Sequence, residues 1–172
     1  MTIIRQETPA DHDQVRAINL AAFETPAEAD IVDRLRRLCA TDHLSLVAES
    51  DDRIVGHILF TPVTIGDTPD SLDGMGLAPM AVHPDVQNQG LGSQLVREGL
   101  AQLKSQGCPF VIVLGHPAYY PRFGFEPASR DGVTCQWPGV PADVFMILWF
   151  DETRRGGTRG VGRYHAAFDE AM

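Results

Sequence analysis

The sequence predicts a mixed α/β fold, with one sheet that holds both parallel and antiparallel strands. An apolar strand at 77–82, an amphipathic helix at 91–105 and a second apolar strand at 110–114 follow one another along the chain. Because the crossover of such a β-α-β unit makes its two strands parallel, these strands are expected to form a parallel pair. Apolar strands at 44–50 and 53–65 are separated only by two aspartates, which predicts an antiparallel hairpin.

Two helices are predicted before the hairpin, after a strand at 2–6. The first helix begins at Thr8, which is followed by a proline suited to the first helical position and by an acidic residue in the first turn. The second begins at Thr25, which forms the pattern of a capping box with Glu28. Apolar residues of the second helix fall on one predicted stripe, namely Ile31, Val32, Leu35 and Leu38.

The length of 172 residues is that of one domain with a single core. A last apolar strand at 143–150 completes the predicted sheet, so the domain is assigned to residues 1–150. Residues 151–172 are predicted to form an extension that begins with a Gly/Arg-rich stretch. Tyr164 and Phe168 are expected to dock this extension back onto the domain.

The amino-acid composition of the chain argues against several classes of function. A net charge of −9 argues against a nucleic-acid binder, because such proteins carry a basic face, and it is compatible with a cationic amine as substrate. No apolar stretch is long enough to span a bilayer and the N-terminus does not read as a signal peptide, so a cytoplasmic protein with no membrane partner is expected. Cys39, Cys108 and Cys135 lie far apart with no metal-binding spacing, which predicts free thiols and no metal site.

The turn at 87–92 reads Q-x-x-G-x-G and lies between the strand at 77–82 and the following helix. A P-loop would continue with Gly-Lys-Ser/Thr, and a Rossmann fingerprint would place a third glycine where this chain has Leu95. A Gly-rich turn before a helix offers a pyrophosphate both backbone N–H groups and the positive end of the helix dipole. Since 83–96 contains no Arg or Lys, binding there is expected to rest on the backbone, on Ser93 and on the glutamine amides.

A second motif follows at 110–125, FVIVLGHPAYYPRFGF, in which Tyr120 stands four residues before Gly124-Phe125. Together the two motifs resemble the GNAT superfamily of N-acetyltransferases, whose acetyl-CoA loop reads Q/R-x-x-G-x-G/A and whose next segment carries such a tyrosine. Further segments are similar to the YhbS-like branch of predicted acetyltransferases, among them AAFETPAEADIVDRLR, GHILFTPV and VPADVFMILWF. The resemblance covers nearly the whole chain.

The resemblance implies the GNAT-type acyl-CoA N-acyltransferase fold, a central mixed sheet that splays between two parallel strands, with helices on both faces. It also implies that acetyl-CoA lies in the gap between those strands. Pro79, which cannot donate to a strand ladder, fits a splayed strand there, and a plain edge strand explains it as well. The residues expected to bind the cofactor are Met80, Ala81, Val82, Gln87, Asn88, Gln89, Gly90, Leu91, Gly92, Ser93 and Tyr120.

Acetyl transfer to an amine needs a neutral amine and a donor for the departing thiolate. Tyr120 is the predicted donor, and Tyr119 is assigned to packing. The strand at 77–82 contains no carboxylate, although members of the superfamily often place a base there. His116, at the end of the strand at 110–114, is the predicted catalytic base, and the alternatives are His57, Glu28 and a chain of waters to solvent.

The sequence therefore predicts an enzyme, an N-acetyltransferase that transfers an acetyl group from acetyl-CoA to a primary amine of a small molecule or peptide. The transfer is expected to be direct, because no nucleophile elbow is present. The alternative is a non-catalytic acyl-CoA-binding sensor or interaction module. A homodimer is left open, and the sequence does not identify the amine.

Overall fold

A computed structural model describes residues 1–67 and 69–171 of the chain. The chain folds into two compact units whose segments alternate in sequence. The first unit comprises Met1–Phe60, Ala78–Ala101 and the C-terminal residues from Ala166. The second comprises Thr61–Leu77 and Gln102–His165. Strands β3 (Arg53–Ile65) and β4 (Leu72–Val82) therefore each contribute to both units.

The sheet of the first unit is built on an antiparallel hairpin. Strand β1 (Thr2–Gln6) pairs with β2 (Leu44–Ser50), and β2 pairs with β3 as far as Phe60. Asp51 and Asp52 form the turn with φ angles of 51° and 61°, a left-handed pair typical of two-residue hairpin loops. The hairpin predicted from sequence is confirmed.

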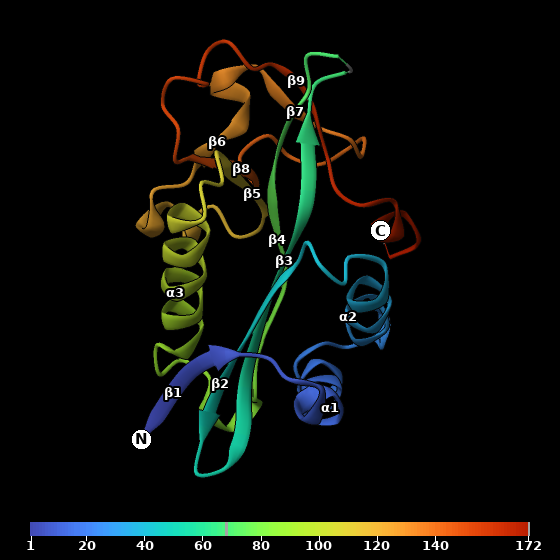
Figure 1. The fold of residues 1–172 in the computed structure, drawn as a ribbon, viewed down its shortest axis with the longest axis vertical. Coiled ribbons are helices and arrows are strands. Elements are labelled where there is room, and N and C mark those ends of the chain that lie inside the picture. The colour runs from blue at the N-terminus through green and yellow to red at the C-terminus, as the bar shows by residue number, and fades with distance from the viewer. Residues whose placement is uncertain (68, 172) are drawn as a thin grey trace. The chain divides into compact units, whose positions relative to one another are not determined.

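Helices cover both faces of this hairpin. Figure 1 shows α1 (His12–Ala22) and α2 (Ala27–Leu38) on one side of it and α3 (Leu91–Ser105) on the other. A short 3-10 turn, η1 (Pro9–Asp11), precedes α1, so the α-helix begins at His12 and not directly after the predicted cap at Thr8. Asp11 accepts hydrogen bonds from the backbone N–H and hydroxyl of Thr8. Helix α3 approaches β3 closely because Gly99 faces Phe60, whose ring would lie 2.3 Å from a Cβ at that position.

The predicted start and apolar stripe of α2 are wrong in two respects. The first intrahelical bond runs from the N–H of Asp30 to the carbonyl of Pro26, so the N-cap is Pro26. The helix therefore begins one residue later than a cap at Thr25 requires. Glu28 is then the second helical residue, and the Thr25–Glu28 capping box does not form. Leu38 is 57% exposed, while Cys39 is buried in its place because the helix ends at that point.

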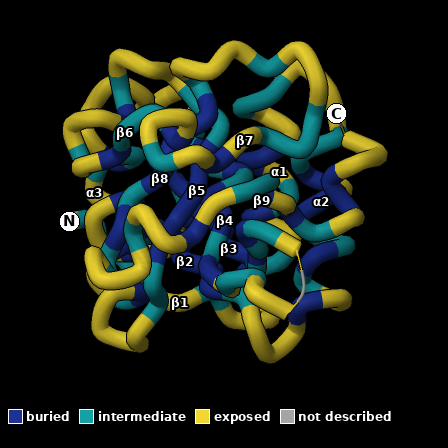
Figure 2. The backbone as a smooth tube through the Cα atoms, turned by 90° about the horizontal axis from the view of Figure 1, so that it is seen from above, coloured by how far each residue is buried: buried dark blue, intermediate teal, exposed yellow. Residues whose placement is uncertain are grey.

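The second unit contains the parallel pair. Met75–Leu77 of β4 lie opposite Val111–Val113 of β5 (Phe110–Leu114) in parallel register, and β5 pairs antiparallel with β8 (Phe145–Trp149). The sheet is therefore mixed, as predicted. Burial of β5 on both faces explains its run of apolar residues (Figure 2).

Several short elements of the second unit are absent from the sequence prediction. Strand β6 (Glu126–Pro127) pairs with β8, and β7 (Val133–Cys135) pairs with β9 (Gly160–Arg163), which also pairs with the end of β3. Their two to four residues are too short for a periodic pattern. Short 3-10 turns complete the described chain, namely η2 (Pro84–Val86), η3 (Tyr120–Phe123), η4 (Ala128–Asp131) and η5 (Ala166–Glu170).

The C-terminal residues are well packed. Ala167 and Phe168 of η5 are buried, and Glu170 pairs with Arg34 of α2 within the first unit. In the second unit, Tyr164 is 6% exposed and stacks on Trp137. The division of the chain into a domain at 1–150 and an extension at 151–172 stays a prediction.

Candidate active site

The turn between β4 and α3 has the backbone geometry of an anion cradle. Asn88 and Gly90 both adopt the left-handed conformation, with φ angles of 62° and 85°. The carbonyl of Gly90 accepts the first bond of the helix, from the N–H of Gln94 at 3.1 Å. Because the N–H groups of Leu91 and Gly92 precede that bond, they have no carbonyl partner within α3. The turn thus presents backbone donors at the N-terminus of a 15-residue helix.

The space beside Gly90 is open. A Cβ placed on this residue would meet no atom within 4 Å among the described residues. Residues 87–90 are all exposed, so the turn is not filled by the protein itself. The donors and the open space fit a pyrophosphate, which needs hydrogen-bond donors and room for two phosphate groups.

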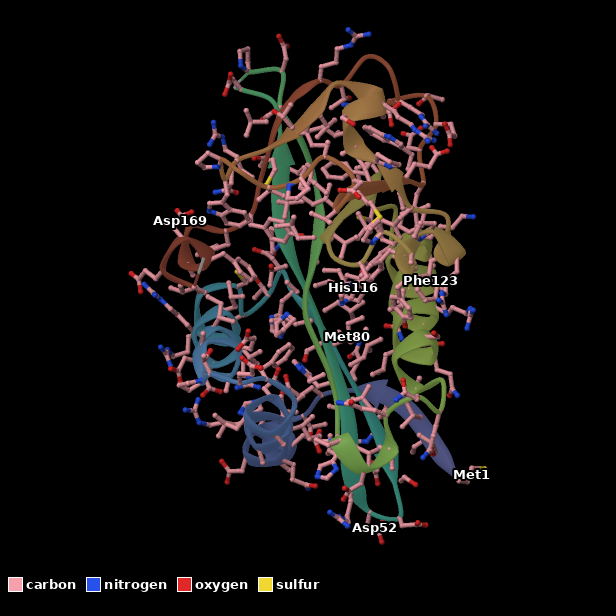
Figure 3. The ribbon with its side chains drawn as sticks, turned by 180° about the vertical axis from the view of Figure 1, so that it is seen from behind. Met1, Asp52, Met80, His116, Phe123 and Asp169 are labelled. Carbon is pink, nitrogen blue, oxygen red and sulfur yellow. The ribbon has the colours of Figure 1, made fainter. Side chains whose placement is uncertain are left out.

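Gln87 holds the turn against the strand. Its side-chain Nε2 donates to the carbonyl of Val82 at 3.0 Å, and the N–H of His83 donates to the carbonyl of Val55 in β3 at 2.9 Å. The amide nitrogen predicted to serve a ligand is therefore engaged by the protein. Met80, labelled on β4 in Figure 3, and Val82 are half-buried, whereas Ala81 is buried.

In the second unit, Tyr120 is embedded in a cluster of aromatic rings. It is 7% exposed and makes edge-on contacts with Tyr119 and Phe125, at centroid distances of 5.1 and 5.7 Å. Gly115 makes room for the ring, because a Cβ there would lie 2.2 Å from Cε2 of Tyr120. Burial, with a smaller effect of Tyr119, raises the pKa of Tyr120 to about 12. The hydroxyl therefore keeps its proton under physiological conditions.

His116, labelled in Figure 3, lies in the segment that follows β5. It is exposed. Its carbonyl accepts from the N–H groups of Tyr119 and Tyr120, at 3.0 and 3.3 Å, so the turn is held by the backbone of His116. Arg122 donates to the carbonyl of Tyr119 and lies 4.5 Å from the centre of that ring. These contacts fix the position of the Tyr119–Tyr120 segment.

His57 of β3 is a structural residue of the first unit. Its Nε2 lies 2.9 Å from Oγ of Ser45, and its Nδ1 lies 3.3 Å from Nδ2 of Asn19. The imidazole is fully buried, and desolvation lowers its pKa to about 4. Both ring nitrogens are engaged and the ring is neutral at pH 7, which leaves His57 no free position for a substrate proton.

Glu28 of α2 has an environment that the capping pattern did not predict. Its Oε2 is shielded from solvent and has no hydrogen-bond partner among the described residues. The sequence carries a signal for this environment in the spacing of Glu28, because positions 28, 32 and 35 share one face of a helix.

The site residues predicted from sequence are divided between the two units. The turn at 87–93 and Met80–Val82 belong to the first unit, as do His57 and Glu28, whereas Tyr120 and His116 belong to the second.

Across residues 1–67 and 69–171, no group of three or more His, Cys, Asp or Glu side chains is arranged to hold a metal ion. The described helices include none long and apolar enough to cross a membrane.

Residues 3–128 match the family described as Acetyltransferase (GNAT) domain. The chain belongs to this GNAT family. It is 37% identical to the uncharacterized N-acetyltransferase YhbS of Escherichia coli K12 over 168 residues, which cover 97% of this chain and 98% of that protein. It is 43% identical to the uncharacterized N-acetyltransferase YjhQ of the same organism over 123 residues, 71% of this chain and 68% of that protein.

Two solved GNAT structures are similar to this chain along almost its whole length. The crystal structure of YhbS from Escherichia coli in complex with CoA has a TM-score of 0.90, with 98% of this GNAT chain and 92% of that chain covered. A GNAT family acetyltransferase from Brucella melitensis in complex with acetyl-CoA has a TM-score of 0.78, with 98% and 99% covered. Each is 37% identical in sequence. The fold class implied by the sequence resemblance is confirmed.

Proposed function

We propose that this protein transfers the acetyl group of acetyl-CoA to a primary amine of a small molecule or peptide. The observation that carries the proposal is the cradle before α3, with its two left-handed residues and the open space beside Gly90. The similar GNAT structures in complex with CoA and acetyl-CoA support it.

In this proposal the N–H groups of the turn at 87–93 bind the pyrophosphate, together with Ser93 and the dipole of α3. The absence of Arg and Lys from 83–96 makes backbone donors the main source of affinity. Met80, Ala81 and Val82 bind the pantetheine arm through their backbone groups.

The chemical step joins the amine nitrogen to the thioester carbon, and the carbon–sulfur bond breaks as the thiolate leaves. Tyr120 donates a hydrogen bond to that sulfur as it gains charge. With a pKa of about 12, the tyrosine is a weaker acid than an alkyl thiol near 8.5, so the proton stays on oxygen in this interaction. The amine loses its proton to a base, for which His116 is the candidate derived from sequence.

The test measures thiol release from acetyl-CoA in the presence of a panel of small-molecule and peptide amines. Release that depends on one class of amine, and an acetylated amine of the expected mass, would support the proposal. Calorimetry with acetyl-CoA gives binding independently of turnover. Tight binding without thiol release from any amine would refute catalysis and assign the chain to the acyl-CoA-binding sensors.

A further inference from the structure

Helix α2 carries a carboxylate in its buried stripe. Glu28, Val32 and Leu35 follow one another at spacings of four and three residues, which places them on one face of the helix. Val32 and Leu35 are 2% and 0% exposed. Glu28 therefore occupies a position where the helix otherwise presents apolar side chains to the interior of the first unit.

The carboxylate of Glu28 is not satisfied by the protein. Its Oε2 is shielded and without a hydrogen-bond partner in the described parts of the chain, although a buried charged oxygen normally has one. The side chain as a whole is half-buried, so the carboxyl group lies at the boundary between the interior and solvent. At the second position of α2 the helix dipole favours the anion but supplies no hydrogen bond to Oε2.

Neighbouring carboxylates on the same helix are satisfied by arginines. Arg16 binds Asp30 and Asp33 at 2.9 and 2.7 Å, and Arg36 binds Asp33 at 2.8 Å. No arginine, lysine or histidine within the described residues forms an ion pair with Glu28. Oε2 is therefore open to a donor from outside the described chain.

The other base candidates are less suited to this task. Both ring nitrogens of His57 are engaged, and its imidazole is fully buried. His116 is exposed and its ring is not held by any hydrogen bond in the described chain. Residues 78–82 of β4 contain no carboxylate.

We propose that Glu28 binds the ammonium group of the acceptor and removes its proton, an inference that rests on the proposed acetyltransferase function. The ammonium donates a hydrogen bond to Oε2, and its proton is relayed through that carboxylate to water, so that no protonated Glu28 accumulates and the nitrogen is left free to attack the thioester carbon. The proton leaves from the part of the side chain that reaches solvent. The acceptor class is a cationic primary alkylamine, because such an amine is neutral in only roughly one molecule in a few thousand at pH 7 and gains most from a base.

The experiment compares Glu28→Gln with Glu24→Gln, a matched change at an exposed residue just before α2. With the alkylamine that the panel identifies, wild-type kcat/KM is expected to be level between about pH 7 and 9. In Glu28→Gln it falls about a hundredfold at pH 7 and rises about tenfold per pH unit, because only amine that is already neutral reacts. Glu24→Gln keeps the wild-type profile, and the Kd for acetyl-CoA is unchanged in both variants.

A second variant separates a chemical role from a packing role. Glu28→Ala leaves space at the carboxylate, so added formate should restore at least tenfold of the lost rate at pH 7, with no effect on Glu24→Ala. Restoration by formate is not expected of a residue that only supports the fold. A wild-type pH profile in Glu28→Gln, or no response of Glu28→Ala to formate, would overturn the inference while leaving the acetyltransferase function intact. A wild-type protein that releases no thiol with any amine would overturn both.

Discussion

Replacement of Tyr120 by Phe tests the chemistry most directly, because it removes one hydroxyl and leaves the aromatic cluster in place. The ring contacts Tyr119 and Phe125 through its edges and faces, so the substitution keeps the packing. Within the described chain the hydroxyl of Tyr120 has no hydrogen-bond partner that the change would leave unpaired. The folded structure is therefore expected to be retained.

The size of the effect follows from the environment of Tyr120. With its pKa raised to about 12, full proton transfer to a thiolate near 8.5 is uphill by about 3.5 units, or about 5 kcal/mol. Tyr120 therefore acts as a hydrogen-bond donor. A hydrogen bond to a charged partner contributes about 1.5 to 3 kcal/mol, which corresponds to a loss of roughly 10- to 150-fold in kcat.

The assay is steady-state thiol release, with the Kd for acetyl-CoA measured by calorimetry on the same preparations. Tyr120→Phe should lower kcat by that factor and change the Kd by less than about threefold, because the bond strengthens only as sulfur gains charge. Tyr119→Phe is the control and should keep most of the activity. Equal losses of kcat in the two variants, or a loss confined to acetyl-CoA binding, would refute the assigned role.

Gly90→Val should weaken acetyl-CoA binding at least tenfold, about 1.4 kcal/mol, whereas Gly107→Val, with a similar φ of 82° and open surroundings, imposes the same backbone strain without affecting the Kd. His57 has a pKa of about 4 when folded and about 6.5 when unfolded, so the unfolded chain takes up a proton first and stability falls as the pH drops through that range. Between pH 7.5 and 5 urea titrations should show a loss of about 2 kcal/mol that is absent in His57→Gln, and parallel curves would refute it. His116→Ala should change kcat/KM by less than about threefold if Glu28 is the base. A hundredfold loss of kcat/KM, with disappearance of the acidic limb of the pH profile, would assign the role of base to His116.

Elements with a clear apolar pattern and clear boundaries could be predicted from the sequence. Strands β1 and β5 and helix α3 have the predicted bounds, because each combines an apolar pattern with clear start and stop residues. Strand β4 begins at Leu72, earlier than predicted, since Gly74 and Gly76 interrupt its apolar run. Those glycines are needed because the ring of Phe110 and the side chains of Val63 and Tyr164 occupy the space of a Cβ.

The candidate site also has parts that could be predicted from the sequence and parts that could not. The cradle follows from local chain geometry, which the glycine spacing encodes, so the sequence indicated it. The environments of Glu28 and His57 depend on which residues pack against them from distant segments. Because a T-x-x-E pattern usually marks a helix cap, the sequence did not indicate that Oε2 of Glu28 is shielded from solvent.

The interleaving of the two units has a consequence for synthesis of the chain. The first unit takes its last residues, from Ala166 onward, from the end of the sequence, where Glu170 pairs with Arg34. During synthesis, the apolar faces that η5 covers therefore stay exposed until residues 166–170 have left the ribosome. Truncation within the last seven residues should reduce the yield of soluble protein, even though it removes none of the residues assigned to binding or catalysis.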